Sequence, residues 1–316
     1  MDAVLTEEQQ ALADAAEGLS ADGLAGARAM LDGADAPARP TADLFDGFNG
    51  LGLDAGAGGT LVDLAIVARA LGRTVCPTPW IAHQLALQAA SAAGLDIADG
   101  LAADARWVLV DGDPVAVREG GTATAAVRLD GPTVSLHPVT GATPRTAMDP
   151  SRPMADLGLG DAIASADGHA DAGRARARAV LSAGLTGVGL GAVERAVDHA
   201  MQREQFGKVV ASFQAVSHQL ADAWTGVELA WSLALYACWA TEEGREDAAA
   251  AVDAAAAKSA TAAVFAAERG MQVHGGIGIT WEADPHLSLR RAMGDEAWMG
   301  GSRRAELALG RAVLAR

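Results

Sequence analysis

A helical period runs through the carboxyl-terminal half of the chain. From Gly173 onward, apolar side chains fall on one long stripe formed by Leu181, Leu185, Val188, Val193, Val197 and Met201. The same period returns over about residues 212–242, 246–272 and 284–316. Four long helices joined by short turns predict an antiparallel bundle. Since much of the 50% apolar share is alanine and aromatics make up 4%, we expect closely packed helices.

Two regions of different character precede this bundle. The first begins with a capping-box pattern at Thr6 and carries shorter helical patterns over 41–51, 61–71 and 81–93. The second holds short β-prone runs separated by Gly and Asp, which is typical of a small antiparallel β domain. The expected fold is mostly α: an amino-terminal helical domain over 1–103, a β domain over 104–172 and a helical bundle over 173–316.

Composition excludes several classes of partner. Lys and Arg total 24 against 40 Asp and Glu, a net charge of −16, which disfavours nucleic acid. The seven histidines and two cysteines show no zinc-ligand spacing, so we expect no metal site. The amino terminus is acidic and amphipathic rather than a signal peptide, and no apolar run approaches the ~20 residues of a membrane span. We therefore expect a soluble, cytoplasmic protein.

A glycine-rich stretch, GVGLG over 187–191, looks like part of a dinucleotide-binding fingerprint. It lies inside the long helical stripe with no strand before it, whereas that fingerprint needs a strand-to-helix turn. We interpret these glycines as a place where two helices pack closely.

Two other segments carry more chemical information. One begins at Arg203 and reads REQFGK, followed by SFQ over 212–214; the other begins at Gln272 and reads QVHGGIGIT. An arginine, an exposed phenylalanine and a glutamine beside helix ends suit a ligand with a pyrophosphate and a flat heterocycle. The Gly275-Gly276 turn admits close approach of a ligand to the backbone.

In this order within a carboxyl-terminal bundle, the two segments resemble the acyl-CoA dehydrogenase family. The resemblance covers the whole chain in domain order, and its specific motifs fall within 178–292. It implies the fold of helical domain, small β domain and four-helix bundle. It also implies α,β-dehydrogenation of an acyl-CoA thioester, in which a carboxylate removes the α-proton and a hydride passes to FAD.

The resemblance also implies which residues bind FAD, which that family holds at a subunit interface. One half-site, at the adenosine diphosphate portion, would consist of Arg203, Phe206, Phe213 and Gln214. The other half-site, reaching the cofactor from the neighbouring subunit, would consist of Gln272, Gly275 and Gly276.

The catalytic base that the resemblance implies is missing. The family places a glutamate at one of two positions, which fall here on Met299 and on Ala177 with its neighbours Arg176 and Arg178. Neither position holds a carboxylate, and loss of a positioned base costs roughly 10²–10⁴-fold in rate. A relocated base could be Glu282, Asp284, Asp295 or Glu296. Each of these also suits a helix terminus or a solvated surface.

The β region departs from the family as well. Residues 104–172 contain neither the Thr-Glu-Pro-x-x-Gly-Ser-Asp-like loop nor the Trp-x-Thr strand that close over the flavin. The chain keeps the motifs for the adenosine portion of FAD and lacks those for the flavin ring and the catalytic base. This combination resembles the shortened subunits of heteromeric acyl-CoA dehydrogenases from actinobacterial steroid degradation. This resemblance implies one half of an enzyme for a bulky, steroid-derived acyl-CoA, in an α2β2 complex whose longer homologous subunit supplies the base. The implied electron acceptor is an electron-transfer flavoprotein.

Two alternatives stay open at this stage. The chain could be a self-sufficient, homo-oligomeric dehydrogenase with a relocated base, or a non-catalytic scaffold or regulatory homologue that has lost FAD. The helical face with Trp224, Trp231 and Trp239 suits either the core or a subunit interface. Despite the acidic surface, Arg203, Arg290 and Arg291 could attract the phosphates of CoA.

Overall fold

The computed structural model describes residues 4–35, 38–53, 56–298 and 300–314. Its amino-terminal part consists of α1 (Glu7–Ser20), α2 (Gly23–Leu31), α3 (Ala38–Phe48), α4 (Leu61–Arg73), α5 (Trp80–Ala92) and the short η1 (Ala98–Leu101). The capping box predicted at Thr6 is confirmed, because its hydroxyl accepts from the Gln9 N–H while the Gln9 side chain accepts from the Thr6 N–H. The sequence patterns missed α2.

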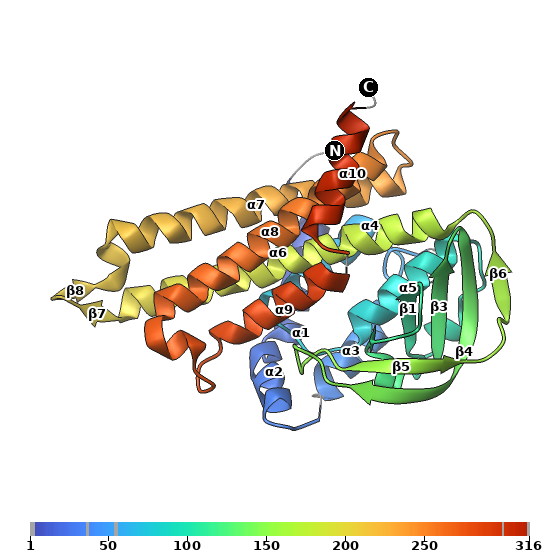
Figure 1. Ribbon diagram of the computed structural model, residues 1–316, viewed down its shortest axis with the longest axis horizontal. Coiled ribbons are helices and arrows are strands. Elements are labelled where there is room, and N and C mark those ends of the chain that lie inside the picture. Colours follow the sequence, from blue (N-terminus) through green and yellow to red (C-terminus); the bar gives the residue numbers. More distant parts are fainter. Residues whose placement is uncertain (1–3, 36–37, 54–55, 299, 315–316) are drawn as a thin grey trace.

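The middle part forms a mixed sheet (Figure 1). Its strands are β1 (Trp107–Asp111), β2 (Val117–Arg118), β3 (Ala125–Asp130), β4 (Thr133–Arg145), β5 (Met154–Leu159) and β6 (Ala164–Ala166), with the short η2 (Gly120–Thr122) before β3. The spatial order is β1-β3-β4-β5-β2, and β6 pairs with β4. One pair departs from the predicted antiparallel arrangement, since β1 runs parallel to β3. The connection over 112–124 is long enough for a crossover where a hairpin was expected.

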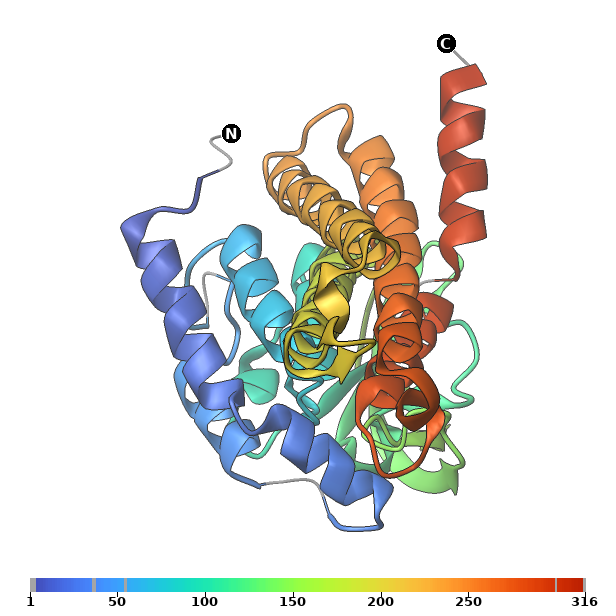
Figure 2. The ribbon, with the colours of Figure 1, turned by 90° about the vertical axis from the view of Figure 1, so that its left-hand side faces the viewer.

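The carboxyl-terminal part is dominated by three long helices, α6 (Ala170–Gln202), α7 (Gln214–Glu242) and α8 (Ala248–His274). They lie side by side, and α9 (Pro285–Trp298) packs against α6 and α8 (Figures 1 and 2). The helix predicted over 284–316 is instead two helices, because Gly300 and Gly301 adopt φ of +84° and +79° before α10 (Ser302–Leu314). The predicted fold class, mostly α with a small β region and a bundle, is confirmed.

Two glycines of the GVGLG stretch, Gly187 and Gly191, lie where α6 crosses α4, and Gly189 faces Val227 of α7 and Ala263 of α8. A Cβ added at Gly187 would lie 2.0 Å from the carbonyl oxygen of Arg69, and one at Gly191 would lie 1.9 Å from that of Arg73. The two backbones are therefore closer than any side chain allows. The prediction of close helix packing is confirmed.

Two helical runs are long and apolar enough to cross a membrane by length and composition. They are Ala170–Gln202 and Ala248–Ile279, each with a mean hydropathy of 1.2 over its best window. Within the structure 72% of the first window and 44% of the second are buried. Both runs belong to the packed bundle, and core helices pass the same test.

Candidate functional site

The first motif forms an exposed hairpin at the end of α6. After Gln202 the chain makes two short strands, β7 (Glu204–Gln205) and β8 (Lys208–Val209), joined by Phe206 and Gly207 with φ of +55° and +77°. Two successive positive φ angles are typical of a tight hairpin turn, and they are unfavourable for an aromatic residue. The turn leaves the Phe206 ring 92% exposed. Such a ring has little burial inside this chain and is available to a ligand.

The second motif lies beside this hairpin in the same chain. Helix α8 ends at His274, Gly275 adopts φ of +65°, and η4 (Gly275–Ile279) follows. The ring of His274 stacks on that of His199 in the last turn of α6, with ring centroids 4.2 Å apart. Figure 2 shows the yellow hairpin next to the orange-red turn. One chain thus brings together the two segments that the sequence assigned to different subunits.

The seven residues predicted to bind FAD gather at this end, which we call the hairpin end: Arg203, Phe206, Phe213, Gln214, Gln272, Gly275 and Gly276. The side chains of Arg203, Gln214 and Gln272 are exposed and make no hydrogen bond within the described part of the chain. A Cβ added at Gly275 or Gly276 would meet no atom within 4 Å. Packing inside the chain therefore does not require glycine at Gly276, whereas the positive φ of Gly275 by itself favours glycine. The free donors and open backbone fit a pyrophosphate.

Lys208 and the two histidines complete the hairpin end. The ammonium of Lys208 lies 4.2 Å from the ring of Phe213, and that ring meets Phe206 edge-on at 6.2 Å. Burial, followed by the nearby His274 and Arg203, lowers the pKa of His199 and favours its neutral form. Sequence reasoning missed Lys208, although it is one of two lysines in the chain and lies next to the motif glycine.

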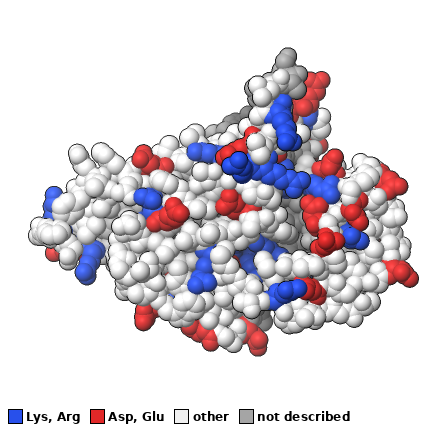
Figure 3. Space-filling model, in the orientation of Figure 1, with Lys and Arg blue, Asp and Glu red and all other residues white. Residues whose placement is uncertain are grey.

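A cavity of about 860 Å³ lies at the other end of α6, between the sheet and the bundle. Strands β1, β2, β3 and β5 form one wall, and α6, α8, α9 and α10 contribute the other walls. Figure 3 shows this face, with acidic and basic side chains gathered near the hollow between sheet and bundle. Ala177, one of the two positions expected for the base, lines it. Met299, the other, lies outside the described residues, but its neighbours Trp298 and Gly300 line the cavity.

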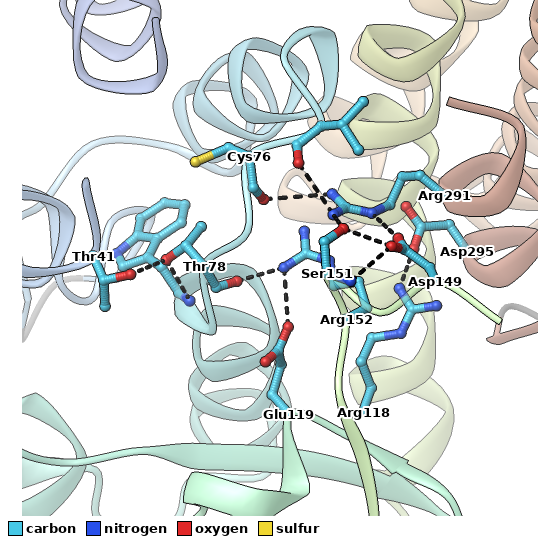
Figure 4. A network of polar contacts seen from close by, with 12 residues as sticks. Thr41, Cys76, Thr78, Arg118, Glu119, Asp149, Ser151, Arg152, Arg291 and Asp295 are labelled. Atoms are coloured by element: carbon cyan, nitrogen blue, oxygen red, sulfur yellow. Dashed lines mark hydrogen bonds and ion pairs between the residues drawn. The ribbon is translucent and has the colours of Figure 1, made fainter. Parts of the chain in front are cut away.

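A buried network of ion pairs lies beneath the cavity (Figure 4). Its pairs are Arg118 with Asp295, Arg152 with Glu119, and Arg291 with Asp149. Arg291 is 1% exposed and also donates to Ser151 and to the carbonyl oxygens of Val75 and Cys76. Burial raises the pKa of Glu119, and Arg152 opposes the shift.

This network corrects the expectation that Arg291 meets CoA phosphates, because its guanidinium is fully used inside the protein. Arg290, its neighbour, is half-buried and donates to the carbonyl oxygen of Met148.

The four candidates for a relocated base have other partners. Asp295 pairs with buried Arg118, and Asp284 pairs with Arg28. Glu296 accepts from the backbone N–H and hydroxyl of Ser302 at the start of α10. Glu282 is exposed, and a hydrogen bond from Thr280 lowers its pKa. Among the described residues none of the four lines the cavity.

The tryptophan face of α7 is divided between core and surface. Trp231 is 8% exposed, with the guanidinium of Arg69 lying 4.5 Å over its ring. Trp239 is half-buried, and Trp224 is 44% exposed near the hairpin end of the helix. The core interpretation therefore holds for Trp231, while Trp224 offers apolar surface.

Comparison with known proteins adds to this geometry. Residues 171–314 match the family model described as acyl-CoA dehydrogenase, C-terminal domain. The chain is 35% identical to acyl-CoA dehydrogenase IpdE2 of Mycobacterium tuberculosis over 76% of this chain and 74% of that protein.

Solved structures share the fold over nearly the whole chain. The steroid ACAD Tcur3481-Tcur3483 aligns with a TM-score of 0.84 and 22% identity, covering 98% of each chain. The ChsE4-ChsE5 complex from Mycobacterium tuberculosis aligns with a TM-score of 0.82 and 21% identity, covering 100% of each chain.

Proposed function

Because the chain belongs to the acyl-CoA dehydrogenase family, an FAD-dependent oxidoreductase class, we propose that it is the cofactor-binding half of a heteromeric dehydrogenase. Its substrate is a bulky, steroid-derived acyl-CoA. The observation that carries this proposal is the pairing of a complete hairpin end with a cavity that lacks a carboxylate at Ala177.

The length of α6 keeps these two features apart. The run from Ala177 to Arg203 is about 39 Å long at the helical rise of ~1.5 Å per residue. An extended dinucleotide is shorter than this, so the hairpin end cannot serve the cavity of its own chain. We infer that it serves a cavity on a second chain, which carries the base.

Each residue of the hairpin end has a defined task toward FAD, which supplies the hydride-accepting ring. Arg203 and Lys208 offset the charge of the pyrophosphate, and Arg203 can bind it in a bidentate manner. Phe206 and Phe213 offer ring faces to the adenine. The open backbone at Gly275 and Gly276 lets the cofactor approach closely, and Gln214 and Gln272 provide side-chain amides.

The comparisons support the proposal of a second, unlike chain and of a steroid substrate. One structural relative is the ChsE4-ChsE5 complex, and another is the steroid ACAD Tcur3481-Tcur3483. We propose the same organisation here, an α2β2 complex with a longer homologous subunit. Electrons would leave to an electron-transfer flavoprotein.

Co-expression with a longer acyl-CoA dehydrogenase that carries the family glutamate tests this proposal. We expect a yellow complex that reduces a dye acceptor with a steroid acyl-CoA. Arg203→Ala should weaken FAD retention roughly 10–100-fold, because a charge-assisted hydrogen bond contributes about 1.5–3 kcal/mol. Arg303→Ala is the matched control, since Arg303 is exposed on α10 and far along the chain from the hairpin end.

A colourless, inactive pair would contradict the proposal. So would a preparation of this chain alone that binds FAD stoichiometrically and oxidises the acyl-CoA, because the chain would then be self-sufficient.

A further inference from the structure

The proposed function assigns no ligand to the cavity between the sheet and the bundle. We propose that it binds an amphipathic carboxylate, with an apolar ring body inside the cavity and the carboxylate on Arg178 and Arg304, and that it releases this ligand unchanged. The absence of turnover rests on the proposed function, in which this chain's cavity has no base. The binding itself rests on the cavity alone.

The walls suit a compact apolar body. They include the side chains Leu109, Val117, Leu129, Ala177, Leu181 and Val252, which come from the sheet, α6 and α8. The volume of about 860 Å³ falls within the roughly 300–1,000 Å³ typical of small-molecule sites. An apolar space of this size, open on one side, would bury most of a fused-ring ligand.

Most charged side chains around the cavity are ion-paired, including Arg178 with Asp253, which also lines the cavity. Arg118, Arg152 and Arg174 are paired with Asp295, Glu119 and Asp111, respectively. Asp149 is likewise paired, with Arg291 beneath the cavity. Arg304, on α10, lines the cavity, is exposed and has no ion-pair partner among the described residues. Asp113 and Asp171 also line the cavity and repel anions from their own positions. The positive charge is therefore confined to the neighbourhood of Arg304, where we expect an anion to bind.

Arg178 provides the specific feature. Its Nη1 pairs with Asp253 at 2.8 Å, whereas its Nε and Nη2 have no hydrogen-bond partner among the described residues and are shielded from water. Nε and Nη2 form one edge of the guanidinium, and that edge can bind a carboxylate through two parallel hydrogen bonds. Leaving these donors buried and unpaired is unfavourable. Turning this edge into the cavity would let a ligand carboxylate satisfy both donors.

Isothermal titration of the full chain with cholate, below its micellar concentration, tests the inference. Cholamide, which replaces the carboxylate with a neutral amide, is the matched ligand. We expect one cholate per chain, binding at least tenfold more tightly than cholamide, with quenching of tryptophan fluorescence from Trp298 in the cavity wall. Arg178→Met and Arg304→Gln should each weaken cholate binding about tenfold or more and leave cholamide unchanged.

Arg145→Gln is the control, because Arg145 is an exposed, ion-paired arginine on β4 away from the cavity. Arg304 lies on the surface, so we expect Arg304→Gln to fold. This variant still tests the inference if Arg178→Met does not fold. Equal binding of cholate and cholamide, no binding of cholate, or normal binding by both cavity variants would overturn the inference. Failure of FAD to load with the partner subunit, alongside normal cholate binding, would instead count against the proposed function.

Discussion

Arg291 shows how far single residues can be interpreted from sequence. Its place after the second motif suggested a phosphate ligand, yet Asp149 and Ser151, its partners, lie about 140 positions earlier in the chain. The pairing exists because α9 packs against the segment that leads into β5. The motifs of the hairpin end are short and local, so the resemblance could single out their residues from the sequence. Sequence spacing could not predict a charge pair created by the tertiary fold.

Asp149→Asn is expected to destabilise the protein by about 3–5 kcal/mol, because it leaves the Arg291 guanidinium buried without its counter-charge. Urea denaturation measures the change. Asp130→Asn serves as the control, since Asp130 pairs with Arg128 at the surface with 62% of its side chain exposed, and should change stability by under ~1 kcal/mol. Equal effects of the two substitutions would contradict the role given to the buried pair.

His83 joins the helical and β regions through a neutral ring. The backbone N–H of Trp107, at the start of β1, donates to Nδ1 at 2.9 Å, and Nε2 donates to the Asn49 Oδ1 at 3.0 Å. Burial, followed by the charge of Arg106, lowers the pKa of His83 to about 3. The unfolded chain takes up this proton first, so the free energy of unfolding should fall as pH drops below ~6.5 towards 3.

The expected slope from this group is at most ~1.4 kcal/mol per pH unit, measured by denaturation between pH 7 and pH 5. His83→Asn should reduce the pH dependence over that range, because an amide oxygen can still accept from Trp107 but does not titrate. His169→Asn, at an exposed position, should retain it. If the wild type, His83→Asn and His169→Asn showed the same pH dependence of stability, His83 would be ruled out as the source of that dependence.

At the scale of elements, the contact between α4 and α6 depends on residues without side chains. Gly187→Ala should cost about 1–3 kcal/mol or more, because the new Cβ would lie 2.0 Å from the Arg69 carbonyl oxygen and the helices must separate. Gly184→Ala in the same helix is the control, since its Cβ would lie 3.7 Å from the nearest atom. Gly184→Ala should raise the free energy of unfolding by up to ~1 kcal/mol, because alanine favours a helix more than glycine does. Thermal unfolding of both variants measures the contrast.

The helical elements were the most predictable part of the fold. Long apolar periods located α6, α7 and α8 within a few residues. In α6 the buried surface is wider than the predicted stripe, whereas Val197 and Met201 of that stripe are exposed. The break before α10 depends on Gly300 and Gly301, which periodicity alone does not mark. The parallel pairing of β1 with β3 depends on a crossover, which local alternation cannot reveal. The cavity was not predictable either, since eight helices and strands of the described part contribute to its walls.

At the scale of the whole molecule, the length of α6 determines how many flavins the proposed complex binds. In the proposed complex each copy of this chain contributes its hairpin end to the cavity of one partner subunit, and its own cavity lacks a catalytic base and a flavin. The number of bound flavins then equals the number of these chains, not the number of polypeptides. An α2β2 complex should therefore hold two flavins among four chains, a ratio that flavin absorbance per mole of protein measures directly. Full occupancy by four flavins would mean that both kinds of cavity bind the cofactor.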